Sequence, residues 1–181
     1  AGTNRVQFVV SDMAGNVSTA SYVVLVDTAS PAPAGCATVA NVRQSGFNAS
    51  TTISGALASL PNPLTGPSCV VIRDAGTYAE QVTARNILND GHRLTIMGDP
   101  GLAGSVPVIS PPAASTGAFV IQNASVTLLN LTVRGASAMP YGVYASSAYV
   151  TISSVSVDSG GKIYTAGVAI SSWTAVSYSS V

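Results

Sequence analysis

The chain carries few residues that could act as general acids, general bases or nucleophiles, and their spacing is irregular. Enzymes that hydrolyse glycosides need two carboxylates facing each other across the bond that breaks. The carboxylates of this chain are scattered from one end to the other, at Asp12, Asp27, Asp74, Glu80, Asp90, Asp99 and Asp158. His92, the single histidine, follows Asn89-Asp90-Gly91, which is typical of a turn. We therefore expect His92 to be a turn residue, and we identify no catalytic residue.

The two cysteines, Cys36 and Cys69, stand alone in the sequence. A structural metal site needs four ligands at close spacing, with histidines among them, so we expect neither a metal nor another cofactor. A disulfide between Cys36 and Cys69 would close a loop of about 33 residues. In the chain-entropy model it would stabilise the fold by about 3 to 4 kcal/mol. Two buried free thiols are the alternative, but we expect the disulfide and therefore an oxidising, extracellular compartment.

The composition is apolar and poor in charge. Hydrophobic residues make up 47% and charged residues only 8%, where an ordinary globular chain has about a quarter charged. The seven Lys and Arg are dispersed and the net charge is zero, so no basic stripe is available for nucleic acid. No apolar run reaches the roughly 18 to 20 residues that a membrane span requires. We expect neither nucleic acid nor a membrane span as a partner of this chain.

The last third of the chain repeats with a period of 24 to 26 residues. The sequence Val-Thr-Leu-Leu-Asn-Leu-Thr-Val at 126–133 returns as Val-Thr-Ile-Ser-Ser-Val-Ser-Val at 150–157 and begins again at Val176. Gly117, Gly142 and Gly167 keep the same step. Short apolar–polar alternations that return at a fixed period are typical of a stacked solenoid of β-strands.

Alternation along these repeats predicts which side chains point inward. The repeated apolar positions are expected inside: Val126, Leu128, Leu131 and Val133, then Val150, Ile152, Val155 and Val157. The hydroxyl side chains between them, Thr127 and Thr151 among others, are expected outside. Arg134 and Asp158 hold equivalent turn positions one repeat apart, which predicts a lateral ion pair.

A third strand in each repeat predicts an outward aromatic stack. If Ala118, Val143 and Val168 point inward in successive repeats, and Val120, Ala145 and Ile170 do so as well, Phe119 and Tyr144 face outward, one above the other. Tyr149 and Trp173 fall near the following turn. Such a surface could hold sugar rings or meet another protein. The alternative is an aromatic ladder that only stabilises the stack.

Residues 5–27 predict a hairpin with its turn at Asp12-Met13-Ala14-Gly15-Asn16. This segment resembles the last two strands of the Ig-like repeats found in large bacterial surface proteins. Because a two-stranded ribbon is marginal in water, we expect it to need a partner sheet. We therefore divide the chain into a terminal Ig-like strand pair at 1–29, a linker at 30–35 and a main domain at 36–181.

A second resemblance covers residues 36–181. An amphipathic helix is predicted at about 50–60, with Ser50 or Thr51 as its cap. Gly-Thr-Tyr-Ala-Glu-Gln-Val at 76–82 and Leu-Thr-Ile-Met-Gly at 94–98 follow it. This combination resembles the N-terminal end of right-handed parallel β-helix proteins, the pectin-lyase-like superfamily. The resemblance implies an all-β, single-stranded parallel β-helix whose open end is covered by the helix, with Glu80 in a structural role.

The family's catalytic signatures Gln-Asp-Thr and Gly-His-Gly are absent from the sequence. We therefore expect a non-catalytic extracellular building block of a bacterial surface protein or a self-assembling filament. Its copies would associate head to tail through the N-terminal strands and the open last coil, although truncation of a longer chain would equally explain these ends. Two alternatives remain: the N-terminal part of a polysaccharide-active enzyme with catalytic coils beyond residue 181, or a module that binds glycans. The candidate glycan or assembly contacts are Phe119, Tyr144, Tyr149 and Trp173.

Overall fold

The computed structural model describes residues 2–26, 31–45, 48–102 and 104–177. The chain divides into two compact units, Ala1–Pro31 and Ala32–Val181. The division falls inside residues 30–35, the segment that the sequence analysis takes as a linker.

The first unit is an antiparallel hairpin of β1 (Gly2–Ser11) and β2 (Val17–Val26), as the alternation predicts. Its turn is organised by Asp12. The Asp12 carboxylate accepts hydrogen bonds from the N–H groups of Ala14 and Asn16, both at 2.9 Å, and from the Asn16 side-chain amide at 2.8 Å. The bonds from Asn16 hold the pKa of Asp12 below its usual value. Gly15 has φ of +83°, a conformation that favours glycine.

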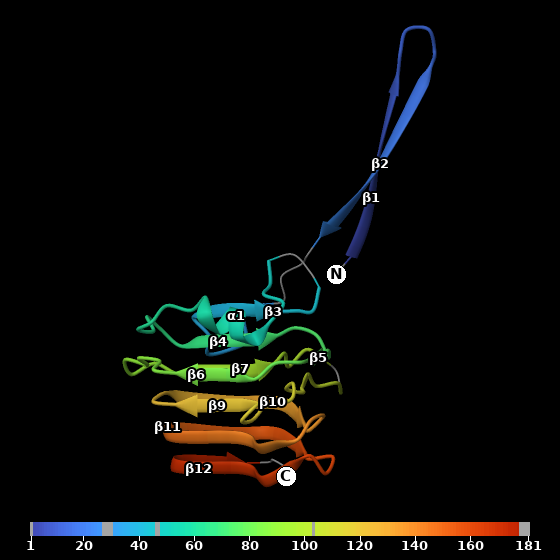
Figure 1. Cartoon of the computed structure of the whole chain (residues 1–181). Helices are drawn as coiled ribbons and strands as arrows, with labels where there is room; N and C mark the ends of the chain where they lie inside the picture. The colour runs from blue at the N-terminus through green and yellow to red at the C-terminus, as the bar shows by residue number, and fades with distance from the viewer. Residues whose placement is uncertain (1, 27–30, 46–47, 103, 178–181) are drawn as a thin grey trace. The chain divides into compact units, whose positions relative to one another are not determined.

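The second unit is an all-β structure with one short helix. Its elements are β3 (Thr38–Val42), α1 (Ile53–Ala58), β4 (Ser68–Ile72), β5 (Thr77–Tyr78), β6 (Val82–Arg85), β7 (Leu94–Gly98), β8 (Val108–Ile109), β9 (Phe119–Gln122), β10 (Ser125–Arg134), β11 (Met139–Asp158) and β12 (Ile163–Ser177). The strands form a curled parallel sheet with the main order β3-β4-β7-β10-β11-β9-β6. Figure 1 shows them in successive layers, with β3 and β4 at one end of this unit and β12 at the other.

Strand register groups the strands into three rows. In the first row Val70, Ile96, Leu128 and Ile152 are successive partners, on β4, β7, β10 and β11. In the second row Tyr78, Ile109, Val133 and Val157 are partners. In the third row they are Val82, Phe119, Val143 and Val168. These twelve side chains belong to one hydrophobic core or pack against it, so all three rows share it.

The predicted orientation is confirmed for residues 126–133 and 150–157 and is wrong for Phe119. The apolar positions of both repeats are buried, whereas Phe119 is 0% exposed and lies in the core. Strand β9 sits one residue later than predicted, because Phe119, rather than Ala118, pairs with Val143. A shift of one residue moves each side chain to the other face of a strand. The register that buries the large Phe119 ring is the one favoured by the hydrophobic effect.

Helix α1 is capped one residue later than predicted, by Thr52, whose side chain accepts a hydrogen bond from the N–H of Gly55 at 3.0 Å. Ile53 and Ala56 are buried in the core, and Leu57 and Leu60 pack against it. The apolar face that the sequence predicts for this helix is therefore confirmed.

Residues that tolerate positive φ lie at the corners, where the chain turns from one row of strands to the next. Asn86, Asn123 and Ser147 have φ of 53°, 50° and 48° at the ends of third-row strands. Asn and Ser adopt this left-handed conformation at a lower energetic cost than bulkier residues, at points where the backbone must turn sharply. The Asn123 side-chain amide also donates to Asn86 Oδ1 at 3.1 Å, which joins the ends of β6 and β9.

Candidate functional site

Of the four aromatic residues predicted to form one outer surface, Phe119 does not reach that surface. Phe119 lies in the core, and Tyr144 is half-buried and stacks on Tyr141, with ring centroids 5.0 Å apart. Tyr149 is 52% exposed. Trp173 is the register partner of Tyr149, but its side chain lies outside the described residues. Tyr149 is therefore the one member of this set that the structure places on an open surface.

Two hollows border Tyr149. The larger has a volume of about 590 Å³ and is lined in part by Pro67, His92, Arg93, Thr127, Tyr149 and Thr151. The smaller, of about 470 Å³, is lined in part by Asn89, Asn123, Ser125, Ser147 and Tyr149. Hydroxyl and amide groups therefore surround an exposed phenol ring on both sides. We call the larger one the Tyr149 hollow.

Hydrogen bonds hold one wall of the Tyr149 hollow in place. Asn89 donates to the carbonyl of Ser125 at 2.9 Å and accepts from the N–H of Ser125 at 2.8 Å. The N–H of His92 donates to the Asn89 carbonyl at 2.8 Å. The turn at 89–92 is thus fastened to the start of β10. His92 is a turn residue, as its sequence context predicts.

A disulfide fixes another wall. Cys36 and Cys69 are bonded, with Cα atoms 5.6 Å apart, which confirms the predicted pairing. The N–H of Ala37 donates to the Pro67 carbonyl at 2.8 Å. Since Gly35 and Pro67 both line the hollow, the covalent link positions this edge relative to β4.

Most of the described carboxylates hold the fold together. Asp74 accepts from the N–H of Gln44 at 2.8 Å and from the Tyr78 hydroxyl at 2.7 Å. Burial, together with this bond to Asp74, raises the pKa of Tyr78. Asp158 forms the predicted ion pair with Arg134, with Nε and Oδ2 3.5 Å apart at an exposed position. Asp90 lies in the 89–92 turn, with φ of 48°, and Asp27 lies outside the described residues.

Glu80 binds the beginning of α1. Its carboxylate accepts hydrogen bonds from the N–H groups of Ile53 at 2.6 Å and Ser54 at 2.9 Å, and from the Ser54 hydroxyl at 2.6 Å. Backbone N–H groups at a helix start lack partners within the helix, so a carboxylate there is stabilising. The structural role expected for Glu80 agrees with these contacts.

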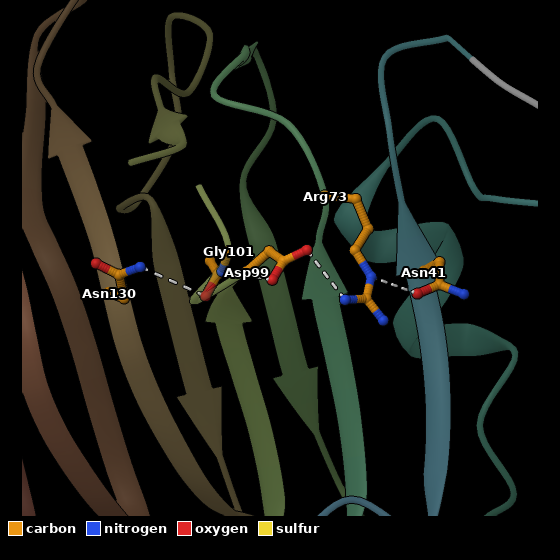
Figure 2. A network of polar contacts seen from close by, with 6 residues as sticks. Asn41, Arg73, Asp99, Gly101 and Asn130 are labelled. Carbon is orange, nitrogen blue, oxygen red and sulfur yellow. Dashed lines mark hydrogen bonds and ion pairs between the residues drawn. The ribbon is translucent and has the colours of Figure 1, made fainter. Parts of the chain in front are cut away.

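A buried charge pair, Arg73 and Asp99, joins the ends of β4 and β7. Arg73 Nη1 lies 3.0 Å from Asp99 Oδ2, and Arg73 Nε donates to Asn41 Oδ1 at 2.8 Å (Figure 2). Burial raises the pKa of Asp99, but hydrogen bonds from the Gly101 N–H and from Arg73 outweigh it and hold the pKa below its usual value. This pair was not predicted from the sequence. The available signal was a separation of 26 residues, one repeat, between opposite charges.

Among the described residues, no group of three or more His, Cys, Asp or Glu side chains is placed to hold a metal ion. Within the same part of the chain, no helix has the length and apolar character of a membrane span. No family model, curated protein or solved structure matches the chain. The function of the chain is therefore inferred from its own residues.

Proposed function

We propose that the chain is a non-catalytic, extracellular structural and adhesive module that contacts glycans through Tyr149 and its surroundings. The observation that carries this proposal is that the carboxylates form hydrogen bonds within the fold. Asp74, Glu80 and Asp99 each accept hydrogen bonds that join separate segments of the fold. A catalytic carboxylate pair must instead face a shared substrate position.

The scaffold of this module, in our proposal, is a right-handed parallel β-helix of the pectin-lyase-like kind. Three rows of parallel strands in register around one core support this architecture. So does the near-constant step between register partners, such as Leu128 with Ile152 and Phe119 with Val143. Each coil hydrogen-bonds to its neighbours, which gives a stiff surface on which exposed side chains keep fixed spacings.

An extracellular location is supported by the disulfide, which persists in oxidising compartments. The low charge content, 8%, is compatible with a surface solubilised by hydroxyl and amide groups. Both features are expected of a secreted or surface-displayed protein.

Glycan contact is supported by the surroundings of Tyr149. An exposed aromatic ring offers a flat apolar face against which a sugar ring can pack, while nearby hydroxyls and amides can bond its hydroxyls. Thr127, Thr151 and Asn123 are such groups beside Tyr149.

Affinity electrophoresis in gels that contain polysaccharide tests the adhesive part of the proposal. A panel of neutral and acidic polysaccharides should include at least one that retards the wild-type chain. Tyr149→Ala should abolish that retardation. Tyr164→Ala should keep it, because Tyr164 is similarly exposed, at 70%, but borders neither hollow. Equal retardation of the two variants, or none of the wild type by any polymer, would contradict the proposed adhesion.

Self-association through the first unit is a second candidate function. Phe8, Val9, Val10 and Val17 on the two strands of the hairpin are more than half exposed, and so is Met13 in its turn. Exposed apolar strands with free edges tend to pair with other strands. The other half of the expected head-to-tail contact, at the end of the chain, includes residues 178–181, which lie outside the described residues.

A further inference from the structure

We propose that the Tyr149 hollow selects saccharides that carry an anionic substituent, a carboxylate or a sulfate, and that Arg93 binds this substituent. The inference rests on the proposed glycan contact at Tyr149 and adds the chemical class of the ligand.

Arg93 is a cation without a counter-ion in the described part of the chain. Arg73 is paired with Asp99 and Arg134 with Asp158, whereas no ion pair or side-chain hydrogen bond engages Arg93. Among the described residues that line the Tyr149 hollow, none is acidic. An exposed guanidinium beside a cavity free of carboxylates attracts an anion from solution.

The guanidinium is suited to this task by its shape. Its planar fork of N–H donors matches the two oxygens of a carboxylate or a sulfate. His92, the neighbouring residue, lines the same hollow. The chemistry therefore favours an oxyanion over a neutral hydroxyl at this position.

The remaining lining fits a sugar ring. Tyr149 offers its exposed ring, and the side chains of Thr127 and Thr151 are register partners on adjacent strands. Their hydroxyls therefore repeat at the strand spacing of about 4.8 Å. The volume of about 590 Å³ lies within the roughly 300 to 1,000 Å³ of ligand sites in general.

The hollow is also formed in advance of binding. The Cys36–Cys69 disulfide and the two hydrogen bonds between Asn89 and Ser125 fix its walls. A ligand would not have to order these segments, which lowers the entropic cost of binding.

Isothermal titration calorimetry with matched oligosaccharides tests the proposal on the full chain. The probes are oligosaccharides of similar length from uncharged dextran, dextran sulfate and alginate, which carry no charge, sulfates and carboxylates respectively. We expect at least one charged probe to bind more tightly than dextran. Because the net charge of the chain is zero, long-range attraction of polyanions by the chain as a whole does not contribute to this preference. The stronger of the two charged probes identifies the substituent.

Arg93→Gln should weaken binding of the preferred charged probe about tenfold or more, since it removes a charge-assisted hydrogen bond. Arg93→Lys should bind the charged probe with an affinity between those of the wild type and Arg93→Gln, because it keeps the charge but loses the planar fork of donors. Arg85→Gln is the control: Arg85 is exposed and lines a different hollow, of about 260 Å³ beside α1. Thermal unfolding monitored by circular dichroism checks that the variants remain folded.

Two results would overturn anion selection while leaving glycan adhesion intact. One is binding of dextran as tight as that of both charged probes. The other is an Arg93→Gln variant that binds the charged probes like the wild type, while Tyr149→Ala loses them. If no probe binds at all, the anionic site is refuted, and the electrophoresis panel then decides separately whether glycan adhesion at Tyr149 fails too.

Discussion

Arg73 and Asp99 show how a single pair of residues can join two parallel strands, β4 and β7, at a cost that only good geometry offsets. The side chains are 3% and 13% exposed, so both charges have left water, and each depends on the other and on further hydrogen bonds. Asn41 and Gly101 supply two of these bonds. The pair therefore makes the alignment of β3, β4 and β7 at this corner dependent on two polar side chains.

Asp99→Asn should lower the free energy of unfolding by about 3 kcal/mol, because it removes the negative charge that lies 3.0 Å from the buried Arg73. Asp158→Asn removes the exposed partner of Arg134 and should cost less than about 1 kcal/mol. Urea denaturation followed by circular dichroism measures both. Equal losses in the two variants would show that burial does not distinguish the two pairs.

The Arg73–Asp99 pair also predicts that the stability of the fold depends on pH in the acid range. The pKa of Asp99 in the folded state lies below the ordinary value of 3.8, so the unfolded chain takes up the proton first as the pH falls. The stabilisation from Asp99 is therefore complete above about pH 4 to 5 and is lost as the pH falls through the lower, folded-state pKa. In urea titrations at several pH values, the difference in the free energy of unfolding between the wild type and Asp99→Asn should become smaller below pH 4. Parallel curves would contradict the depressed pKa.

At the scale of elements, close stacking explains why glycine recurs before the third-row strands. A Cβ at Gly142 would lie 2.5 Å from the carbonyl oxygen of Gly167 and 2.7 Å from a methyl carbon of Val157. A Cβ at Gly117 would meet the carbonyl oxygen of Tyr141 at 2.9 Å. The close approach of adjacent strands thus requires glycine at 117 and at 142.

Gly142→Ala should lower the free energy of unfolding by about 2 kcal/mol or more, since backbone atoms would have to move. Gly66→Ala is the matched control, because its Cβ would meet only the Ala37 methyl at 3.4 Å. Thermal unfolding of both variants measures the difference. A Gly142→Ala variant as stable as Gly66→Ala would show that the coils separate easily at this point.

The elements also show what could be predicted from the sequence. Alternation identified the inward residues at 126–133 and 150–157, because both repeats have the same length and the same apolar positions. It failed at Phe119, where aligning Gly117 with Gly142 moved the register by one residue. The Tyr149 hollow could not be predicted from the sequence, because its lining residues come from the end of the linker, from the turn at 91–93 and from strands β10 and β11. Only the three-dimensional register brings these segments together.

At the scale of the whole molecule, two compact units of different character share one chain. The second unit has its own core. In the first, residues 7–21, the part whose side chains are described, are all exposed. A two-stranded ribbon of this kind is marginal alone in water. We therefore expect the first unit to gain stability by pairing with another chain.

Val10→Lys should reduce self-association through the first unit, because a charge on a strand with an exposed edge disfavours its pairing with another strand. Leu88→Lys is the control: Leu88 is 59% exposed and Val10 68% exposed, but Leu88 lies in the second unit. Light scattering should show a mass that rises with concentration for the wild type and for Leu88→Lys, and much less for Val10→Lys. A wild-type chain that stays monomeric at high concentration would refute self-association.

We propose, above all, that this chain holds saccharide polymers without cutting them. Size-exclusion chromatography with light scattering, applied to the chain after prolonged incubation with a polysaccharide that retards it, measures the complex and the polymer length together. We predict a complex of higher mass than the polymer alone and a polymer of unchanged length. A polymer that shortens with time, and is spared by a folded variant lacking one carboxylate, would contradict the claim.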